Sequence, residues 1–274
     1  MDFADVPLPQ QNDRSESLDS HEDDRPREHC GVFAVMGTQD ASILTALGLH
    51  ALQHRGQEGC GIATFDGKRF HTERHLGLVG DNLTGPDLPQ RLPGFAAIGH
   101  TRYATQGGTL IRNVQPLFAD LSTGGFAIAH NGNLTNARAL REQLVSDGAI
   151  FQSTSDTECI LQLIARSRRL GVVERFIDAL RHIEGAYALV CLTNDMVIGA
   201  RDPLGIRPLV LGDLNGAPIL ASESCALDMI GARFIRAVEN GEIVTITRGP
   251  DGKGRVESHR PFGRIAARPC IFEF

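Results

Sequence analysis

Short apolar runs bounded by glycine or polar residues recur along the first half of the chain. The first, from Gly31 to Gly37, contains only Val, Phe, Ala and Met between its glycines, which predicts a strand. Apolar residues at positions 43, 44, 47 and 52 follow at helical spacing, and this helix should stop near Gly56. We expect further strands at residues 61–65, 96–103 and 126–129.

Two helices are predicted in the middle of the chain. Ser155 and Glu158 have capping-box spacing, and Ile160, Leu161 and Ile164 follow at helical intervals. A second apolar face runs over residues 172–183 and should end near Gly185.

The last third has the pattern of antiparallel hairpins. Asn194-Asp195 separates apolar runs at 186–192 and 196–200, and Asn215-Gly216 separates runs at 209–211 and 219–221. Strands, then two helices, then hairpins favour an α+β fold with mainly antiparallel sheets, rather than alternating βαβ units. No internal repeat is visible.

The first 29 residues differ in kind from the rest. Between residues 10 and 29 only Leu18 is strongly apolar, while charged residues, Ser and Pro fill most positions. Such a segment cannot bury enough surface to offset its ordering entropy, so we expect a disordered tail. The folded part is therefore expected to begin at Cys30.

Composition excludes several classes of protein. The chain has 274 residues, 42% of them hydrophobic, and a net charge of -6, which is enough apolar material for a sizeable core. It has no apolar stretch long enough for a membrane span, no secretory signal and no basic stripe for nucleic acid. We expect a cytoplasmic protein that binds neither membrane nor nucleic acid.

Six cysteines occur, at positions 30, 60, 159, 191, 225 and 270. None forms a CxxC pair, so a compact zinc site within the chain is not expected, and the low density argues against a disulfide framework. By default these are buried, inert thiols. Cys30 is different, because it lies at the border between the polar tail and the first strand.

Four segments cluster polar residues at the ends of predicted elements, where functional groups are commonly displayed. They are residues 28–31, 99–105, 130–133 and 153–158, and a fifth, 53–58, follows a helix. Together, in this order, they resemble the class II glutamine amidotransferases, which are N-terminal nucleophile hydrolases. The resemblance runs from Glu28 to Phe274. It implies a four-layer αββα sandwich of two mainly antiparallel sheets, with L-glutamine as substrate.

In that family the nucleophile is a cysteine at the mature N-terminus, a role that the resemblance assigns to Cys30. Removal of residues 1–29 would free an α-amine with a reference pKa of about 7.7 to 8.0, which can act as the base for its own thiol. A cysteine–histidine dyad using His54, His100 or His130 is the alternative. It is disfavoured because the papain-type cysteine opens a helix rather than a strand.

The resemblance also assigns the remaining site residues. Asn131 and Gly132 would supply the oxyanion hole, although Asn-Gly alone more often marks a hairpin turn. Arg102 would bind the substrate carboxylate and Asp156 the substrate ammonium. Without the family, Arg102 would be read as a surface residue and Asp156 as a helix-start residue. We expect all five residues to line one pocket.

The pro-segment and the segments 30–35, 201–208 and 221–224 are similar to the amidophosphoribosyltransferases of purine biosynthesis. Residues 30–262 are then the glutamine amidotransferase domain, and 263–274 the start of a truncated phosphoribosyltransferase domain that would receive the ammonia. Two alternatives stay open. One is a non-catalytic, unprocessed partner or regulatory module, and the other is a hydrolase of the same fold that cleaves a different amide.

Cys270 has two interpretations. It is either a buried thiol or, as the resemblance to one branch implies, one of four ligands of a 4Fe-4S cluster whose other ligands lie in the missing domain. No cofactor is expected in this chain itself, whereas a full-length relative would carry the cluster and Mg. A full-length protein is also expected to be a homo-oligomer.

Overall fold

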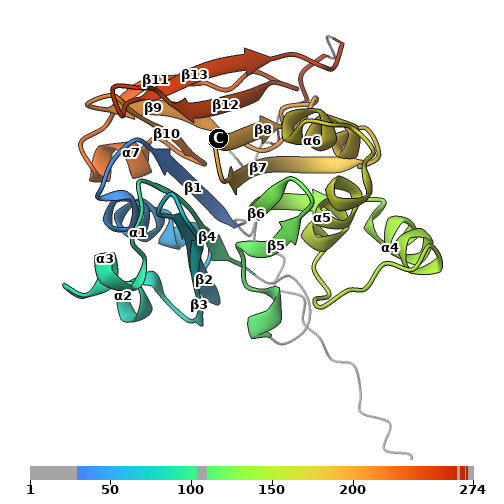
Figure 1. Cartoon of the computed structure of the whole chain (residues 1–274), viewed down its shortest axis with the longest axis horizontal. Helices are drawn as coiled ribbons and strands as arrows, with labels where there is room; N and C mark the ends of the chain where they lie inside the picture. Colours follow the sequence, from blue (N-terminus) through green and yellow to red (C-terminus); the bar gives the residue numbers. More distant parts are fainter. Residues whose placement is uncertain (1–29, 104–109, 264–265, 269, 271–274) are drawn as a thin grey trace, which may run out of the picture.

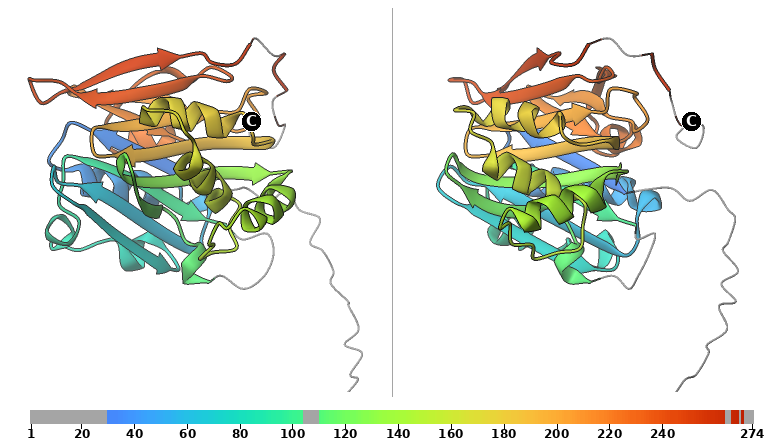
Figure 2. Two further views of the ribbon diagram at one scale, coloured as in Figure 1. Left: turned by 45° about the vertical axis from the view of Figure 1, so that its right-hand side comes forward. Right: turned by 90° about the vertical axis from the view of Figure 1, so that its right-hand side faces the viewer.

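Two β-sheets stacked face to face form the centre of the chain, and helices cover their outer faces (Figure 1). The structure is a computed structural model that describes residues 30–103, 110–263, 266–268 and 270. The same layers are seen from two further sides in Figure 2. Within the described residues, all strand pairings are antiparallel. The predicted α+β, four-layer αββα sandwich is therefore confirmed.

The first sheet has seven strands in the order β11-β9-β10-β1-β4-β2-β3. Their bounds are β1 (Gly31–Met36), β2 (Gly59–Phe65), β3 (Phe70–Leu76), β4 (Ala96–Arg102), β9 (Val210–Leu214), β10 (Ala217–Ala221) and β11 (Arg233–Ala237). Cys30 directly precedes β1, the middle strand of this sheet, and the strand itself is the one predicted from the apolar run after Cys30.

The second sheet has six strands in the order β13-β12-β8-β7-β6-β5. Their bounds are β5 (Leu117–Leu121), β6 (Gly124–Leu134), β7 (Gly185–Thr193), β8 (Met196–Arg201), β12 (Ile243–Arg248) and β13 (Gly254–His259). The two predicted hairpins are β7–β8 and β9–β10, and Asn215 and Gly216 in the second turn both have positive φ.

Helices lie on both outer faces. The first sheet is covered by α1 (Ala41–Ala51), α2 (Val79–Asn82), α3 (Leu88–Arg91) and α7 (Cys225–Met229). The second is covered by α5 (Thr157–Arg166) and α6 (Val172–Leu180), with α4 (Ala137–Ser146) beside α5. Two 3-10 turns, η1 (Gln53–Arg55) and η2 (Ile111–Asn113), connect elements near the carboxyl end of β4.

The core explains why β1 reads as an unbroken apolar run. Val32, Ala34 and Met36 face the second sheet, while Phe33 and Val35 face the helices, so every residue of the strand is buried. The edge strand β3, by contrast, alternates exposed and half-buried residues. Both faces of the central strand pack in the interior. Its apolar sequence therefore predicts the strand, but it does not tell which side chains face the second sheet and which face the helices.

Two local predictions were wrong. The strand expected at 126–129 continues as β6 to Leu134, so Asn131 and Gly132 lie inside a strand paired with β7 rather than beyond its end. The capping box expected at Ser155 and Glu158 does not form. The Glu158 carboxylate instead accepts hydrogen bonds from the backbone N–H groups of Gln152 and Ser153, which fixes the segment ahead of α5.

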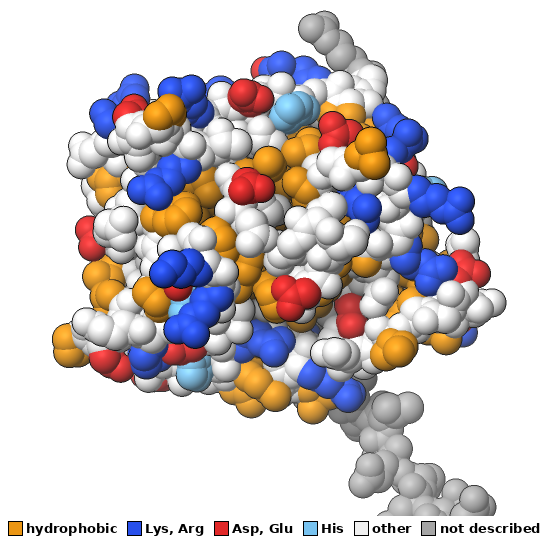
Figure 3. All heavy atoms as spheres, viewed as in Figure 1, with side chains coloured by type: hydrophobic (Ala, Val, Ile, Leu, Met, Phe, Trp, Pro, Cys, Tyr) orange, Lys and Arg blue, Asp and Glu red, His pale blue; other side chains and the backbone are white. Residues whose placement is uncertain are grey.

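On the face shown in Figure 3, basic side chains are spread among acidic ones. Among the described residues, no helix is both long and apolar enough to cross a membrane. The proposed pro-segment 1–29 lies outside the described residues, as does most of 263–274, of which residues 263, 266–268 and 270 are described.

Candidate active site

A small cavity of about 230 Å³ lies where the carboxyl end of β4 meets the start of β1 and the end of β6. Four of the five residues predicted to form the site line it: Cys30, Arg102, Gly132 and Asp156. Its volume is below the roughly 300–1,000 Å³ of sites for drug-sized ligands, which points to a small ligand. The other lining residues are Tyr103, Asn113, Gln115, His130, Asn133, Thr154 and Ser155.

The backbone around Cys30 is fixed by side chains of neighbouring elements. Arg55 Nε donates to the Cys30 carbonyl at 3.1 Å, and the next amide, Gly31 N–H, donates to Thr101 Oγ1 at 3.1 Å. The Cys30 Sγ is 3.4 Å from the backbone N of Tyr103, which donates to it. The thiol is therefore held at the edge of the cavity by β4 and η1.

Burial raises the pKa of the Cys30 thiol above its usual value, and the Tyr103 N–H and the charge of Arg102 offset this only in part. A thiol with a raised pKa is protonated at neutral pH and needs a base to become nucleophilic. Among the described residues, the hydrogen bonds of Cys30 Sγ go to the Tyr103 backbone and not to a histidine.

His100 is a poor candidate for that base. It lies buried on β4, where burial and then the charge of Arg102 lower its pKa to about 3. Transfer of a proton from a thiol with a raised pKa to an imidazole with a lowered pKa is strongly unfavourable. His100 Nε2 is 3.2 Å from the His130 carbonyl, so the imidazole links the two sheets. The geometry of His100 thus gives the dyad alternative no support.

Asp156 is the residue that precedes α5, and both of its oxygens have partners. Oδ2 accepts a hydrogen bond from Leu134 N–H at 2.9 Å, while Oδ1 lies 3.8 Å from His130 Nδ1. Burial alone would raise the pKa of this carboxyl, but His130 and the backbone N–H groups of Leu134 and Thr157 lower it to about 2. Asp156 is therefore a fixed negative charge at the cavity wall.

Arg102, the last residue of β4, places a positive charge in the same cavity. One of its terminal nitrogens donates to the Asn113 carbonyl at 3.2 Å, and its Nε is buried without a hydrogen-bond partner among the described residues. A cation and an anion in one small cavity match the carboxylate and ammonium of a free amino acid.

Asn131 is not among the lining residues, contrary to expectation. Along β6 it shares one face with Ala127 and Ala129, which pack between the sheets, so its side chain turns toward the first sheet. The side chain is fully buried, yet neither its amide nitrogen nor its oxygen has a hydrogen-bond partner within the described part of the chain. Buried polar groups are rarely left so, and such exceptions cluster at functional sites.

Gly132 lies in the wall of the cavity with a φ of +148°, which side chains rarely allow. A Cβ added there would also overlap the carbonyl oxygen of Ala186 on β7. Glycine is thus required by the strand itself.

Polar residues that sequence reasoning did not single out hold the site together. Gln115 Oε1 accepts from His130 N–H at 2.7 Å, and Gln115 Nε2 donates to Thr157 Oγ1 at 3.0 Å. Asn113 pairs with Thr154 through both its side-chain oxygen and its nitrogen. The Asn113 contacts join η2 to the segment before α5, and Gln115 joins β6 to α5. In the sequence, Asn113 and Gln115 are recognisable only as polar residues between apolar ones.

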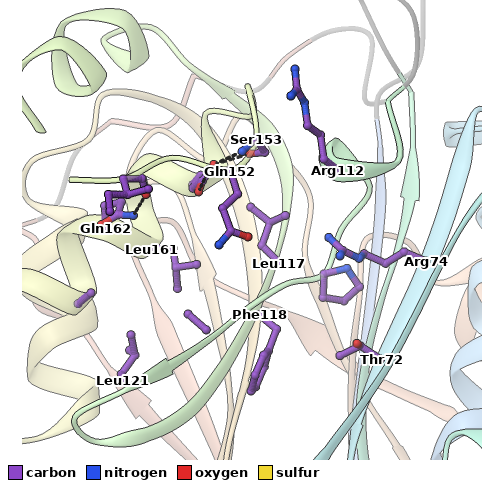
Figure 4. Close-up of a pocket in the computed structure, with 15 residues that line it drawn as sticks. Thr72, Arg74, Arg112, Leu117, Phe118, Leu121, Gln152, Ser153, Leu161 and Gln162 are labelled. Atoms are coloured by element: carbon purple, nitrogen blue, oxygen red, sulfur yellow. Dashed lines mark hydrogen bonds between the residues drawn. The ribbon is translucent and has the colours of Figure 1, made fainter. Parts of the chain in front are cut away.

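A second, larger cavity of about 310 Å³ borders the same segment. Figure 4 shows Arg74 and Arg112 on one side of it and Leu161 and Gln162 of α5 on the other. Its apolar floor includes Leu117 of β5. None of the five predicted site residues lines this cavity.

The described residues do not fit an iron–sulfur cluster. Such a cluster is normally held by four cysteine thiolates. Cys270 is half-buried, and among the described residues it belongs to no group of metal-binding side chains. Cys60, Cys159 and Cys191 are buried in the core. The ligand role of Cys270 stays a prediction about a longer protein.

Comparison with known proteins finds similar sequences in one family. A family model described as a glutamine amidotransferase domain matches residues 100–229. The amidophosphoribosyltransferase of Rhizobium etli is 58% identical over 251 residues, which cover 92% of this chain and 51% of that protein. The chloroplastic amidophosphoribosyltransferase of Glycine max is 46% identical, over 92% of this chain and 44% of its own length.

A solved structure is also similar. Glutamine phosphoribosylpyrophosphate amidotransferase from Bacillus subtilis superimposes with a TM-score of 0.81 at 41% identity, over 88% of this chain and 51% of that one. The chain spans about half the length of the relatives it matches.

Proposed function

This chain belongs to the class II glutamine amidotransferases, and we propose that it hydrolyses L-glutamine to glutamate and ammonia as the glutaminase half of an amidophosphoribosyltransferase. The observation that carries the proposal is the joint presence of Cys30, Arg102, Gly132 and Asp156 in one cavity of amino-acid scale. The ammonia would pass to a phosphoribosyltransferase domain, beginning at about residue 263, in the first committed step of purine biosynthesis.

The proposed mechanism begins with cleavage of the His29–Cys30 bond. The freed α-amine takes the thiol proton, and Cys30 Sγ attacks the side-chain amide carbon of glutamine. The oxygen of that amide becomes an oxyanion, which the Asn131 amide and the Gly132 N–H stabilise. Collapse returns the proton to the leaving nitrogen and releases ammonia. Water then cleaves the thioester to give glutamate and the free thiol.

Substrate binding is assigned to the two fixed charges. Arg102 would pair with the α-carboxylate of glutamine and Asp156 with its α-ammonium. The low pKa of Asp156 supports this role, because the carboxylate is fully ionised at neutral pH, where glutamine carries its ammonium. A free α-amino acid is thereby favoured over a peptide amide.

We further propose that the protein works in the cytoplasm and that its full-length form is a homo-oligomer. Cys270 would bind a 4Fe-4S cluster there, together with three cysteines supplied by the acceptor domain. Cys270→Ser in a full-length, anaerobically prepared protein should then remove the visible absorption of the cluster. Iron-free full-length enzyme with undiminished activity would assign Cys270 to packing.

The test measures the mature N-terminus by mass spectrometry and ammonia release from glutamine. We expect a processed chain that starts at Cys30 and turns over glutamine, and an intact chain that is nearly inactive. A matched pair that begins directly at residue 30, with Cys or Ala there, separates the nucleophile from processing. The Ala form should release no ammonia above background.

Other outcomes would identify the alternatives. An intact Met1 together with no turnover in either form favours a non-catalytic partner module. Turnover of other amides without preference for glutamine favours a different hydrolase of this fold. Full activity with residues 1–29 attached would overturn the role of the α-amine.

A further inference from the structure

Three metal-binding side chains from distant parts of the sequence meet on the helix side of the first sheet. His54 belongs to η1, while Glu223 and Cys225 lie at the turn from β10 into α7. One ligand atom from each, His54 Nε2, a Glu223 carboxylate oxygen and Cys225 Sγ, all lie within 4.8 Å of one another. Among the described residues this is the single group of its kind.

The distances are close to those of a coordinated cation. His54 Nε2 is 3.1 Å from Glu223 Oε2, and Cys225 Sγ is 3.5 Å from the same oxygen. Zinc bonds of about 2.0 Å to nitrogen and oxygen and about 2.3 Å to sulfur place tetrahedral ligand atoms roughly 3.3 to 3.6 Å apart. The three atoms therefore need only small side-chain shifts to enclose one ion.

Neighbouring groups orient the ligands as metal sites require. His54 Nδ1 lies 3.1 Å from the Ala51 carbonyl, which accepts its hydrogen and turns Nε2 toward Glu223. Arg55 donates to Glu223 Oε1, which leaves Oε2 facing His54 and Cys225. Ligating histidines and carboxylates usually have such outer partners.

We infer that His54, Glu223 and Cys225 form a binding site for one divalent cation of the zinc class. The mixture of imidazole, carboxylate and thiolate favours zinc over calcium or magnesium, which prefer all-oxygen ligands. Three protein ligands leave a fourth position for water. The His54 side chain is 44% exposed, so an ion can reach the site from solvent.

Binding changes the proton count in a defined way. The cation replaces the thiol proton of Cys225, which leaves to solvent. The Arg55 charge opposes a nearby cation, but it pairs with the carboxylate oxygen that the cation does not need.

The site is connected to the nucleophile through one residue. Arg55 donates to Glu223 with one nitrogen and to the Cys30 carbonyl with another. A cation on Glu223 is therefore two contacts from Cys30.

The experiment uses the full chain carrying Cys30→Ser, so that the nucleophile thiol cannot bind the metal. Metal-free protein is titrated with cobalt(II), and zinc is then added in competition. We expect one equivalent of cobalt, a thiolate-to-cobalt charge-transfer band, the visible absorption of a four-coordinate ion, and its complete displacement by zinc. Magnesium and calcium should not displace it.

Matched variants test the ligands. Loss of an outer partner typically costs 10- to 100-fold in affinity, so Cys225→Ser and His54→Gln should each weaken zinc binding by more than about 100-fold. Cys225→Ser should also abolish the charge-transfer band, whereas Cys270→Ser should leave both unchanged. Circular dichroism checks the fold of each variant. Absence of zinc binding in the parent, or equal binding in Cys225→Ser, would overturn the inference.

Discussion

The two cavities that border residues 152–158 differ in size and in the state of their polar atoms. In the larger one, Ser153 and Glu158 are hydrogen-bonded to each other at 2.6 Å, and Gln162 donates to a backbone carbonyl. Beside the smaller one, Arg102 Nε and both amide atoms of Asn131 are buried without partners among the described residues. The cavity with the larger volume is thus not the cavity that has buried, unpartnered polar atoms beside it.

That difference has a physical basis. A buried polar atom without a partner costs about 1–3 kcal/mol, so a fold retains it only where something else compensates. Transition-state binding is such a compensation, because a donor aimed at a charge that develops during reaction must be unpaired beforehand. The smaller cavity has this property and the larger one lacks it.

The largest change in activity is expected when Asn131 is replaced. Replacement by Leu removes the proposed oxyanion donor and should lower kcat for glutamine by about 100- to 1,000-fold. Because the same change removes two unpartnered polar atoms, we expect the free energy of unfolding to stay equal or to rise by up to about 1–3 kcal/mol.

Asn113 provides the matched control for Asn131. Its amide is fully used by Thr154, so Asn113→Leu should lower the free energy of unfolding by about 1–3 kcal/mol. Steady-state kinetics and urea unfolding of both variants decide the matter. Equal destabilisation of the two variants would mean that the Asn131 amide contributes to folding as Asn113 does, and would contradict an amide reserved for the oxyanion.

Arg102 is expected to give the next effect. Arg102→Ala should raise KM for glutamine by about 10- to 100-fold with a smaller change in kcat, because its proposed ion pair exists in both ground and transition states. Arg74→Ala, in the larger cavity, should leave KM within about twofold. A kcat loss at unchanged KM would contradict a role in ground-state binding.

Asp156 links the smaller cavity to pH. Its pKa of about 2 in the folded chain lies below the ordinary 3.8, so its ionised form stabilises the fold above about pH 4. That contribution, about 2 kcal/mol at neutral pH, is lost as the pH falls from about 4 to 2. Asp156→Asn should therefore be destabilising at pH 7 and nearly neutral at pH 2.

Urea unfolding at several pH values measures the Asp156 effect. The exposed Asp120 of β5 is the control, and Asp120→Asn should change the free energy of unfolding by less than about 0.5 kcal/mol. A difference between wild type and Asp156→Asn that does not vary with pH would contradict the pKa argument.

The smallest effects are expected in the larger cavity. Arg112→Ala and Gln162→Ala should leave kcat and KM for glutamine within about twofold, because neither residue lines the Cys30 cavity. A tenfold loss from either would mean that the two cavities act as one site.

The sequence predicted the layers of this fold better than the details of its site. The apolar run at β1 and the hairpin turns follow from local physics, and the sandwich itself followed from the resemblance rather than from periodicity. The continuation of β6 through Asn131 and Gly132 could not be anticipated, because Asn-Gly is a strong hairpin-turn signal and here pairing with β7 overrides it.

Contacts between distant segments were the least accessible from sequence. Glu223 lies 169 residues from His54, and no spacing rule joins residues so far apart. The same is true of Asn113 and Thr154, whose pairing fixes the cavity wall. Such pairs become visible only when the topology brings their elements together.

The extended backbone at Asn131-Gly132 also bears on the chemical lifetime of the protein. Asparagine followed by glycine ages readily in flexible chains, because the glycine amide nitrogen attacks the asparagine side chain and leaves aspartate or isoaspartate. Pairing with β7 on one edge, and burial of the side chain, keep the two groups from reaching that geometry. Each excursion to the unfolded chain, by contrast, exposes this dipeptide to conversion into an acidic residue that the buried position cannot solvate.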